Sequence, residues 1–272
     1  MHGLGNDYVY IDCTKNNKIA DESKFAEFVS NRHFGIGSDG LVLIYKSSIA
    51  DFKMRIFNSD GTEAQMCGNG IRCVGKYVYD KKLTYKKEIY IETLAGIKKL
   101  NLFTKENCVE EIEVDMGEPI LEPERIPVIS NKSIAKNILV NINNIKFYIT
   151  CVSMGNPHGV VIVKDLQNFN VQKFGRLLET HNIFPDKANI EFVQIIDKNN
   201  IKMRVWERGT GETLACGTGA CAAVVACNIN NYVFTEVNVK LLAGNLKINW
   251  NKHNNHIYMR GGATTVFEGE LI

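Results

Sequence analysis

Two stretches of this 272-residue chain repeat one pattern at a fixed distance. The first reads MRIFNSDGTEAQMCGNG (54–70) and the second reads MRVWERGTGETLACGTG (203–219). Met, Arg, Glu, Cys and two Gly coincide at an offset of 149 positions, which is the distance from Cys67 to Cys216. A second echo lies upstream, where Gly5-Asn6 matches Gly155-Asn156. The offset is too long for a solenoid repeat, so it predicts a duplicated domain with matching residues facing one cleft.

The pattern of each half predicts a strand-rich α+β unit around one buried helix. Residues 21–31 predict a helix with Asp21 as its N-cap, and the small, apolar run 70–79 predicts a buried one. Strands of the first half are expected at 8–12, 41–45, 54–58, 89–93, 98–103 and 111–116. The second half repeats this order, with strands expected at 160–163, 192–196 and 202–207 and helices at 171–181 and 220–228. Three of the five prolines lie within 117–127, where we expect the linker.

Charge and hydropathy exclude two large classes of protein. Lys and Arg number 32 and Asp and Glu number 30, so the chain has no basic excess that would predict a nucleic-acid partner. The N-terminal residues lack the basic and apolar regions of a signal peptide. The longest apolar segment, Ala220–Cys227, is too short to span a bilayer. We therefore expect a cytoplasmic protein with no membrane and no nucleic-acid partner.

The chain carries eight cysteines, and no two of them form a C-x-x-C pair. A cytosolic chain of this length rarely builds a disulfide framework, and the spacings do not predict a zinc site. Buried cysteine behaves as a small apolar residue, so a structural role is the default for each of the eight. Cys67 and Cys216 differ from the others because both stand directly before a G-x-G sequence.

The C-G-x-G motif brings together the chemistry needed to invert a carbon stereocentre. Each G-x-G is expected to open a helix, whose first N–H groups attract a carboxylate and lower the pKa of an adjacent thiol. Inversion needs a base on one face of the carbon and an acid on the other. A thiolate and a thiol can serve as this pair. The paired motifs therefore predict a racemase or epimerase that acts on an amino acid, and no pyridoxal-phosphate pattern is apparent.

Other polar residues predict a role less specifically. His158 could orient a thiol or a carboxylate, although a lone histidine is more often structural. Glu207-Arg208 is expected near a strand end, where such pairs are usually solvated, but Arg208 could bind a carboxylate with both guanidinium arms. Three asparagines occupy turn-like positions, where this residue is common: Asn6, Asn58 and Asn189.

Longer motifs give the chain a family resemblance along nearly its whole length. These are HGLGNDYVYID (2–12), NRHFGIGSDG (31–40), RIFNSDGTEAQMCGNGIRC (55–73), SMGNPHGVVIV (153–163) and RVWERGTGETLACGTGACAA (204–223). In combination they resemble the diaminopimelate epimerase family. That resemblance implies an α+β fold of two pseudo-symmetric domains, each a mixed β-sheet barrel around a central helix. It also implies domains of 1–116 plus 263–272 and of 117–262, with the active site in the cleft between them.

The resemblance further implies an activity and a set of partners. The family interconverts LL- and meso-diaminopimelate without cofactor or metal, in lysine and peptidoglycan precursor biosynthesis, and the implied assembly is a homodimer. Cys67 and Cys216 would be the proton donor and acceptor. Carried over by motif, the residues that bind the reacting carboxylate would be Gly68, Asn69, Gly217 and Thr218. The other substrate contacts would be Asn6, Asn58, Asn156, Asn189, Glu207 and Arg208, with His158 and Glu207 also tuning the pKa values of the cysteines.

Two positions depart from the family pattern: Gly40, and Thr218, which replaces a common serine. Three other functions stay open. Many members have glutamine where this chain has Gly40, so Gly40 is given no side-chain contact. A proline or hydroxyproline racemase of the same fold is the main alternative, although such relatives usually have histidine in place of Asn69 and lack a Glu-Arg pair. A redox-responsive thiol protein and a cysteine-ligated metal protein are the others, and activity assays after reduction or in chelator would separate them.

Overall fold

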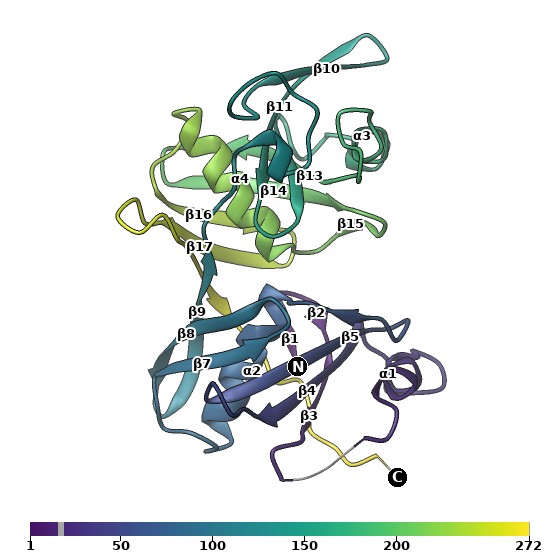
Figure 1. Cartoon of the computed structure of the whole chain (residues 1–272), viewed down its shortest axis with the longest axis vertical. Coiled ribbons are helices and arrows are strands. Elements are labelled where there is room, and N and C mark those ends of the chain that lie inside the picture. Colours follow the sequence, from purple (N-terminus) through teal and green to yellow (C-terminus); the bar gives the residue numbers. More distant parts are fainter. Residues whose placement is uncertain (16–18, 272) are drawn as a thin grey trace. The chain divides into compact units, whose positions relative to one another are not determined.

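The computed structural model describes residues 1–15 and 19–271. The chain divides into two compact units, which we describe separately (Figure 1). Unit 1 comprises Met1–Asp115 and Arg260–Ile272, and unit 2 comprises Met116–Met259. The two boundaries fall within strands β9 (Cys108–Gly117) and β18 (Ile257–Gly262).

Unit 1 is a mixed sheet with two helices. Its hydrogen-bonded strand order is β9-β8-β7-β5-β4-β3, and a short strand, β6, pairs with β5. The N-terminal residues form a separate two-stranded ribbon of β1 and β2. The elements are β1 (His2–Gly3), β2 (Asn6–Asp7), β3 (Val9–Asp12), α1 (Glu22–Ser30), β4 (Gly40–Lys46), β5 (Phe52–Asn58), β6 (Glu63–Ala64), α2 (Gly68–Asp80), β7 (Glu88–Thr93) and β8 (Gly96–Lys105).

Unit 2 repeats this order of elements. Its strands run β10-β11-β12-β13-β14-β16-β17, and a short strand, β15, pairs with β14 as β6 does with β5. The elements are η1 (Pro123–Arg125), β10 (Ile138–Ile142), β11 (Ile145–Ser153), β12 (Pro157–Ile162), α3 (Val171–Glu179), β13 (Asn189–Ile195), β14 (Asn200–Glu207), β15 (Gly211–Thr213), α4 (Gly217–Ile229), β16 (Glu236–Leu241) and β17 (Gly244–Trp250). The predicted α+β class is confirmed, with four α-helices among the described residues.

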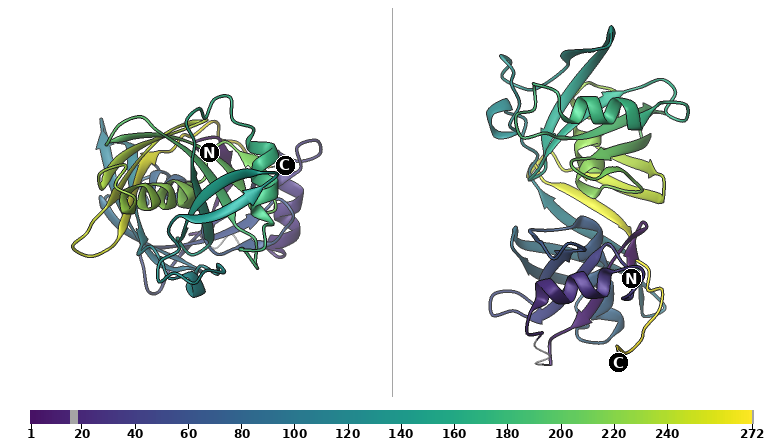
Figure 2. Two further views of the ribbon diagram at one scale, coloured as in Figure 1. Left: turned by 90° about the horizontal axis from the view of Figure 1, so that it is seen from above. Right: turned by 90° about the vertical axis from the view of Figure 1, so that its right-hand side faces the viewer.

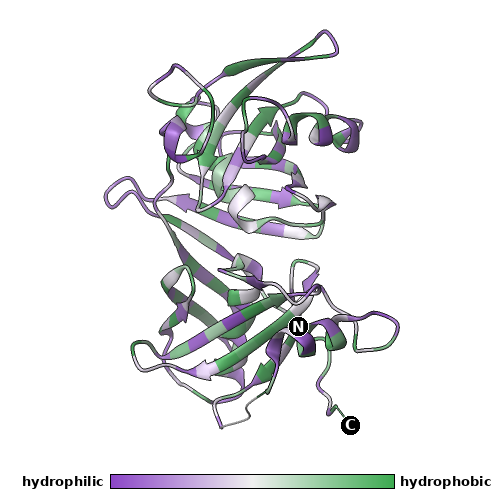
Figure 3. Ribbon diagram, turned by 45° about the vertical axis from the view of Figure 1, so that its right-hand side comes forward, coloured by the Kyte–Doolittle hydropathy of each residue, from purple (hydrophilic) through white to green (hydrophobic). Residues whose placement is uncertain are grey.

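Each unit contains two pairs of parallel strands, and the connection between the strands of each pair includes a helix. Strands β3 and β4 are parallel and joined through α1, and β12 and β13 are parallel and joined through α3. Helices α2 and α4 follow the same rule between β5 and β7 and between β14 and β16. Strands covered on both faces read as continuous apolar runs, which explains Leu41-Val-Leu-Ile44 in β4. Several other strands show alternating green and purple bands in Figure 3, as expected where one face is exposed.

The core of unit 1 lies on both faces of its sheet. On one face, Ala26 and Val29 of α1 pack against Leu41, Leu43 and Phe57. Asp21 caps this helix, as predicted, because its side chain accepts a hydrogen bond from the Lys24 amide. Helix α2 contacts β1, β5 and β8.

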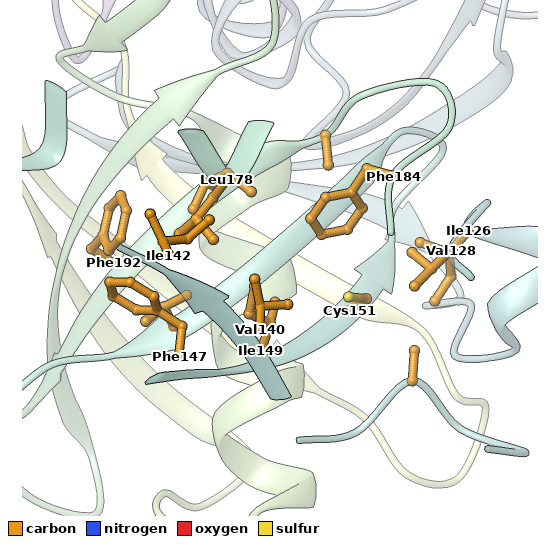
Figure 4. Close-up of a cluster of buried hydrophobic side chains, with 14 of the residues drawn as sticks. Ile126, Val128, Val140, Ile142, Phe147, Ile149, Cys151, Leu178, Phe184 and Phe192 are labelled. Carbon is orange, nitrogen blue, oxygen red and sulfur yellow. The ribbon is translucent and has the colours of Figure 1, made fainter. Parts of the chain in front are cut away.

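One apolar cluster of unit 2 includes Phe147, Ile149, Phe184 and Phe192 (Figure 4). Helix α3 packs against β13 and β14 from the outside of the sheet (Figure 1 and the right-hand view of Figure 2). Helix α4 is buried over most of its length and contacts strands β11 to β14, β16 and β17. Of the helices in the described residues, none combines the length and the apolar character that a membrane span requires.

Two sequence expectations need correction. The proline-rich segment 117–127 is not a free linker, because Ile120 pairs with Ser153 and both Pro123 and Ile126 are buried within unit 2. Strands β10 and β11 were also missing from the predicted order. Apolar and polar residues alternate only weakly in 138–153, because β11 is buried along most of its second half. An alternating pattern therefore does not predict a strand there.

Replacing Gly175 with alanine should destabilise unit 2. A Cβ at this position of α3 would lie 2.5 Å from Cβ and Cγ of Trp206, whose indole is held by a hydrogen bond to Glu179. We expect a loss of about 1–3 kcal/mol of unfolding free energy, measured by chemical denaturation. Gln172→Ala, at an exposed position of the same helix, is the control and should change stability by less than about 0.5 kcal/mol. Equal stability of the two variants would contradict this packing.

Candidate active site

Each of the two predicted cysteines caps the first turn of a buried helix. Cys67 is the N-cap of α2, and its sulfur accepts a hydrogen bond from the Gly70 amide at 3.4 Å. Cys216 is the N-cap of α4, and its sulfur accepts from the Gly219 amide at 3.3 Å. The expectation that both C-G-x-G motifs open helices is therefore confirmed. Each sulfur lies at the positive end of a helix dipole, beside backbone amides that can bind an anion.

The repeated Arg and Glu of the duplicated motif serve a structural purpose. In unit 1, Arg55 donates from Nε and Nη2 to the two Glu63 oxygens, at 2.7 and 2.9 Å. In unit 2, Arg204 does the same to Glu212, at 2.7 and 3.0 Å. Such two-armed pairs fix orientation as well as distance. They join β5 to β6 and β14 to β15, and so fix the hairpin that leads into each cysteine.

Polar groups of the N-terminal ribbon surround Cys67, which is partly exposed. Its thiol donates to Asn6 Oδ1 at 3.3 Å. The Asn6 amide in turn donates to Asp39 at 2.9 Å, and Asp39 forms an ion pair with Arg32 at 3.0 Å. Tyr8 is a neighbour of Cys67. Burial raises the pKa of its phenol, and the charge of Cys67 raises it further. The structure thus brings Asn6 to Cys67, as the motifs predict.

The other predicted residues of unit 1 contact their own unit. Asn58 ends β5, and its amide donates to the Thr62 hydroxyl at 2.9 Å. Asn69 is buried, and its Oδ1 accepts from Arg72 at 2.9 Å. Because the Asn69 side chain is held in this way, its backbone amide is the group suited to bind a carboxylate. Gly68 begins α2 and offers a second amide.

Cys216 is buried, and its surroundings oppose ionisation. Its sulfur lies 3.4 Å from the Thr218 hydroxyl, as expected for the first turn of the helix. Burial raises the pKa of Cys216 well above its usual value, and the nearby Glu207 and Glu191 carboxylates raise it further. The Thr218 hydroxyl and the Gly219 amide act in the opposite direction. The expected lowering of the pKa by the helix start is therefore wrong for Cys216, because burial and two like charges outweigh it.

His158 is completely buried and is bonded at both ring nitrogens. Nδ1 lies 2.7 Å from Glu191 Oε1, and Nε2 lies 2.9 Å from Asn156 Oδ1. His158 and Asn156, which were predicted for separate roles, are thus in direct contact. Asn189, on the adjacent strand, donates to the Pro157 carbonyl at 3.2 Å and accepts from the Arg208 amide at 2.9 Å. Its side chain therefore orders the backbone around this site.

The turn after β14 is fixed from several sides. Glu207 accepts a hydrogen bond from the Thr213 hydroxyl, and Arg208 donates to the Asp186 carbonyl at 3.1 Å. Glu179, buried at the end of α3, accepts from the Gly209 amide at 2.8 Å. These contacts fix the backbone of this turn and bring Arg208 beside Asn189.

The residues of these networks that were absent from the predicted site include Asp39, Arg72, Glu179 and Glu191. Two of them left a signal in the sequence. Glu191 interrupts the apolar run of β13, and Arg72 lies among the small, apolar residues of α2. A charge in an otherwise buried segment needs a partner, so both could have been flagged. Within residues 1–15 and 19–271, no group of three or more His, Cys, Asp or Glu side chains is arranged to hold a metal ion.

Comparison with known proteins gives the same relationship as the motifs. The sequence model of the family described as "Diaminopimelate epimerase" matches residues 1–122 and 150–266. A diaminopimelate epimerase of Methanococcus maripaludis is 57% identical over 271 residues, covering 100% of this chain and 98% of the relative. One of Acetivibrio thermocellus is also 57% identical, covering 100% of this chain and 96% of the relative.

A solved structure shows the same fold at low sequence identity. A phenazine biosynthesis protein of the PhzF family from Bacillus anthracis superposes with a TM-score of 0.70 and 21% identity. The match covers 100% of this chain and 95% of that structure. Two relatives are 57% identical over the whole chain, and the family model matches most of it. The chain belongs to the diaminopimelate epimerase family of isomerases.

Proposed function

We propose that this protein interconverts LL- and meso-diaminopimelate by moving one proton at an α-carbon, and so supplies a precursor of lysine and peptidoglycan. The observation that supports this most strongly is that two thiols, one in each unit, cap buried helices at matching positions of a duplicated motif. We place the site in a cleft to which the domain 1–116 with 263–272 contributes Cys67 and the domain 117–262 contributes Cys216.

In this mechanism, the thiolate of one cysteine removes the α-hydrogen and the thiol of the other donates a proton to the opposite face. The proton count balances, because one sulfur takes the α-proton of the substrate while the other gives up its own, and no oxidant or reductant is needed. The α-carboxylate would bind the amides of Gly68, Asn69, Gly217 and Thr218 at the two helix starts. These amides stabilise the charge that develops as the carbon loses its proton.

The remaining predicted residues would bind the substrate or adjust the cysteines. We propose that Asn6, Asn58, Asn156, Asn189, Glu207 and Arg208 hold the distal amino-acid head group. His158 and Glu207 would set the pKa values of the thiols, which is supported by the proximity of Glu207 to Cys216. We propose a homodimer as the assembly, and the cytoplasmic location stays a prediction.

Isotope exchange tests this function directly. After incubation with LL-diaminopimelate in D₂O under reducing conditions, we expect the meso isomer with one deuterium at the inverted α-carbon. A two-base mechanism places solvent deuterium in the product, because the donated proton comes from the second thiol. Chiral chromatography with mass spectrometry measures both the configuration and the label. Absence of both conversion and exchange by folded, reduced protein would refute the proposal.

The proline or hydroxyproline racemase alternative has less support. Two relatives named as diaminopimelate epimerases match the whole chain at 57% identity. The chain also has Asn69 and the Glu207-Arg208 pair, as expected for a diaminopimelate epimerase and not for a proline racemase. Assaying L-proline and trans-4-hydroxy-L-proline beside LL-diaminopimelate would separate the two functions, and we expect turnover of diaminopimelate alone.

A further inference from the structure

A buried, hydrogen-bonded pair of side chains lies behind the cysteine of unit 2. The side chains of His158 and Glu191 are both completely buried, and Nδ1 lies 2.7 Å from Oε1. The other carboxylate oxygen, Oε2, is buried with no hydrogen-bond partner among the described residues. A buried carboxyl group with an oxygen that lacks a partner costs free energy, so its presence here points to a use in the site.

Gly219 places this carboxylate next to Cys216. A Cβ on Gly219 would lie 2.6 Å from Glu191 Oε1 and 3.2 Å from Cys216 Sγ. The oxygen and the sulfur therefore approach the same side of Gly219, in the first turn of α4. Only glycine leaves room for the carboxylate at this point. The helix start also favours a negative charge at that place.

Unit 1 has different chemistry at the matching positions. Each unit has a parallel pair of strands joined through its first helix. In unit 2 this pair places Gly159 opposite Ile190, and in unit 1 it places Val9 opposite Leu41. By this register His158 corresponds to Tyr8, and Glu191 corresponds to the buried, apolar Val42. The repeat offset matches Glu207 with Asn58 in the same way. The nearest acidic groups of the Cys67 network, Asp7 and Asp39, are both paired with Arg32.

From this asymmetry we propose that Glu191 is a positioning residue that keeps Cys216 protonated in the resting enzyme and fixes the ring of His158. The two thiols then differ before substrate arrives, Cys216 as the acid and Cys67 as the base. The proposal rests on the two-base function given above, and it adds Glu191 to the residues that the family motifs assign.

The charges around Cys216 support this role. The groups that face its sulfur are Glu191 from β13, Glu207 from β14, and the Thr218 hydroxyl and Gly219 amide of α4 itself. Glu191 is faced by His158 from β12 and by Cys151 from β11, whose pKa it also raises. A carboxylate close to a thiol disfavours the thiolate, because like charges repel strongly where little water screens them. Glu191 thus contacts His158 and also acts on Cys216.

The test is the pH dependence of iodoacetamide alkylation, followed separately at Cys67 and Cys216 by peptide mass spectrometry of the full chain. Glu191→Gln removes the charge but keeps the shape of the side chain. We expect the midpoint of Cys216 alkylation to fall by about one pH unit, which is about a tenfold faster reaction at neutral pH. The pH at which kcat declines on the alkaline side should fall by the same amount with KM unchanged, because Cys216 then loses its proton at a lower pH. Glu236→Gln, at an exposed position of the same unit, is the control and should leave both unchanged.

Several outcomes would overturn the proposal. A Cys216 midpoint that stays constant or rises in Glu191→Gln contradicts it. Glu191→Asp retains the charge, so a midpoint for that variant as low as that of the glutamine variant contradicts it too. If Glu191→Gln does not fold, a wild-type Cys216 midpoint at or below that of Cys67 still contradicts the proposal. Predicted alkylation midpoints without any epimerisation would leave the role of Glu191 standing and refute the proposed function instead.

Discussion

Alanine at Cys67 or at Cys216 is expected to lower kcat/KM on LL-diaminopimelate by about a thousandfold or more. A positioned acid or base contributes about 10²–10⁴-fold to a proton transfer, and each variant removes the only group that we assign to one face of the carbon. Each cysteine also caps its helix, so a small loss of stability should accompany the loss of activity. Initial rates by chiral chromatography, with thermal unfolding of each variant, measure both effects.

Cys227 provides the matched control for this experiment. It lies in the same helix as Cys216 and is fully buried, and burial raises its pKa to about 12. Cys227→Ala should therefore keep the wild-type turnover and lose only packing energy, about 1 kcal/mol. If one of the two active-site variants kept wild-type turnover with inversion, the two-base mechanism would be wrong.

The second large effect is expected at Arg72, whose side chain is completely buried in unit 1. Its guanidinium donates to the Gly68 carbonyl at 3.1 Å, to Asn69 Oδ1 at 2.9 Å and to the Gly262 carbonyl at 3.2 Å. Arg72→Met fills much of the space but leaves these buried acceptors without that donor. We expect a loss of about 3 kcal/mol or more of unfolding free energy, since each unmet buried acceptor costs about 1–3 kcal/mol.

Two further variants show whether hydrogen bonding by Arg72 is the cause. Arg72→Lys keeps the charge, but its ammonium lacks the planar fork that lets the guanidinium reach three acceptors. We therefore expect an intermediate loss of unfolding free energy. Lys24→Ala, on the exposed side of α1, should change stability by less than about 0.5 kcal/mol. Denaturant unfolding measures all three variants. An Arg72→Met protein as stable as the wild type would show that these bonds do not stabilise unit 1.

Features set by a few neighbouring residues could be predicted from the sequence. Asp21 caps α1 because its side chain reaches an amide three residues away, and in both C-G-x-G motifs the cysteine caps the helix in the same way. The repeat at Cys67 and Cys216 likewise predicted two units with the same order of elements. In each case the cause lies within one turn of helix or one hairpin, where sequence spacing and spatial distance agree.

Features that depend on distant residues could not be predicted. The pKa of Cys216 is set by burial and by Glu191 and Glu207, which come from other strands. Spacing along the chain does not reveal how close these two carboxylates lie to the Cys216 sulfur. The segment around Ile120 was expected to link domains because prolines interrupt regular structure, yet its pairing with Ser153 holds it inside unit 2. Strand pairing across many residues decides such cases, and local composition does not.

The interrupted course of unit 1 has a consequence for how the protein is made. Unit 2 is one continuous stretch, Met116–Met259, whereas unit 1 needs residues from 260 onward to complete it. Gly262 accepts a bond from Arg72, and Thr264 pairs with His2. Domains fold as their residues leave the ribosome. The half that carries Cys216 can therefore mature on the nascent chain before the half that carries Cys67, which also needs the residues made after Met259.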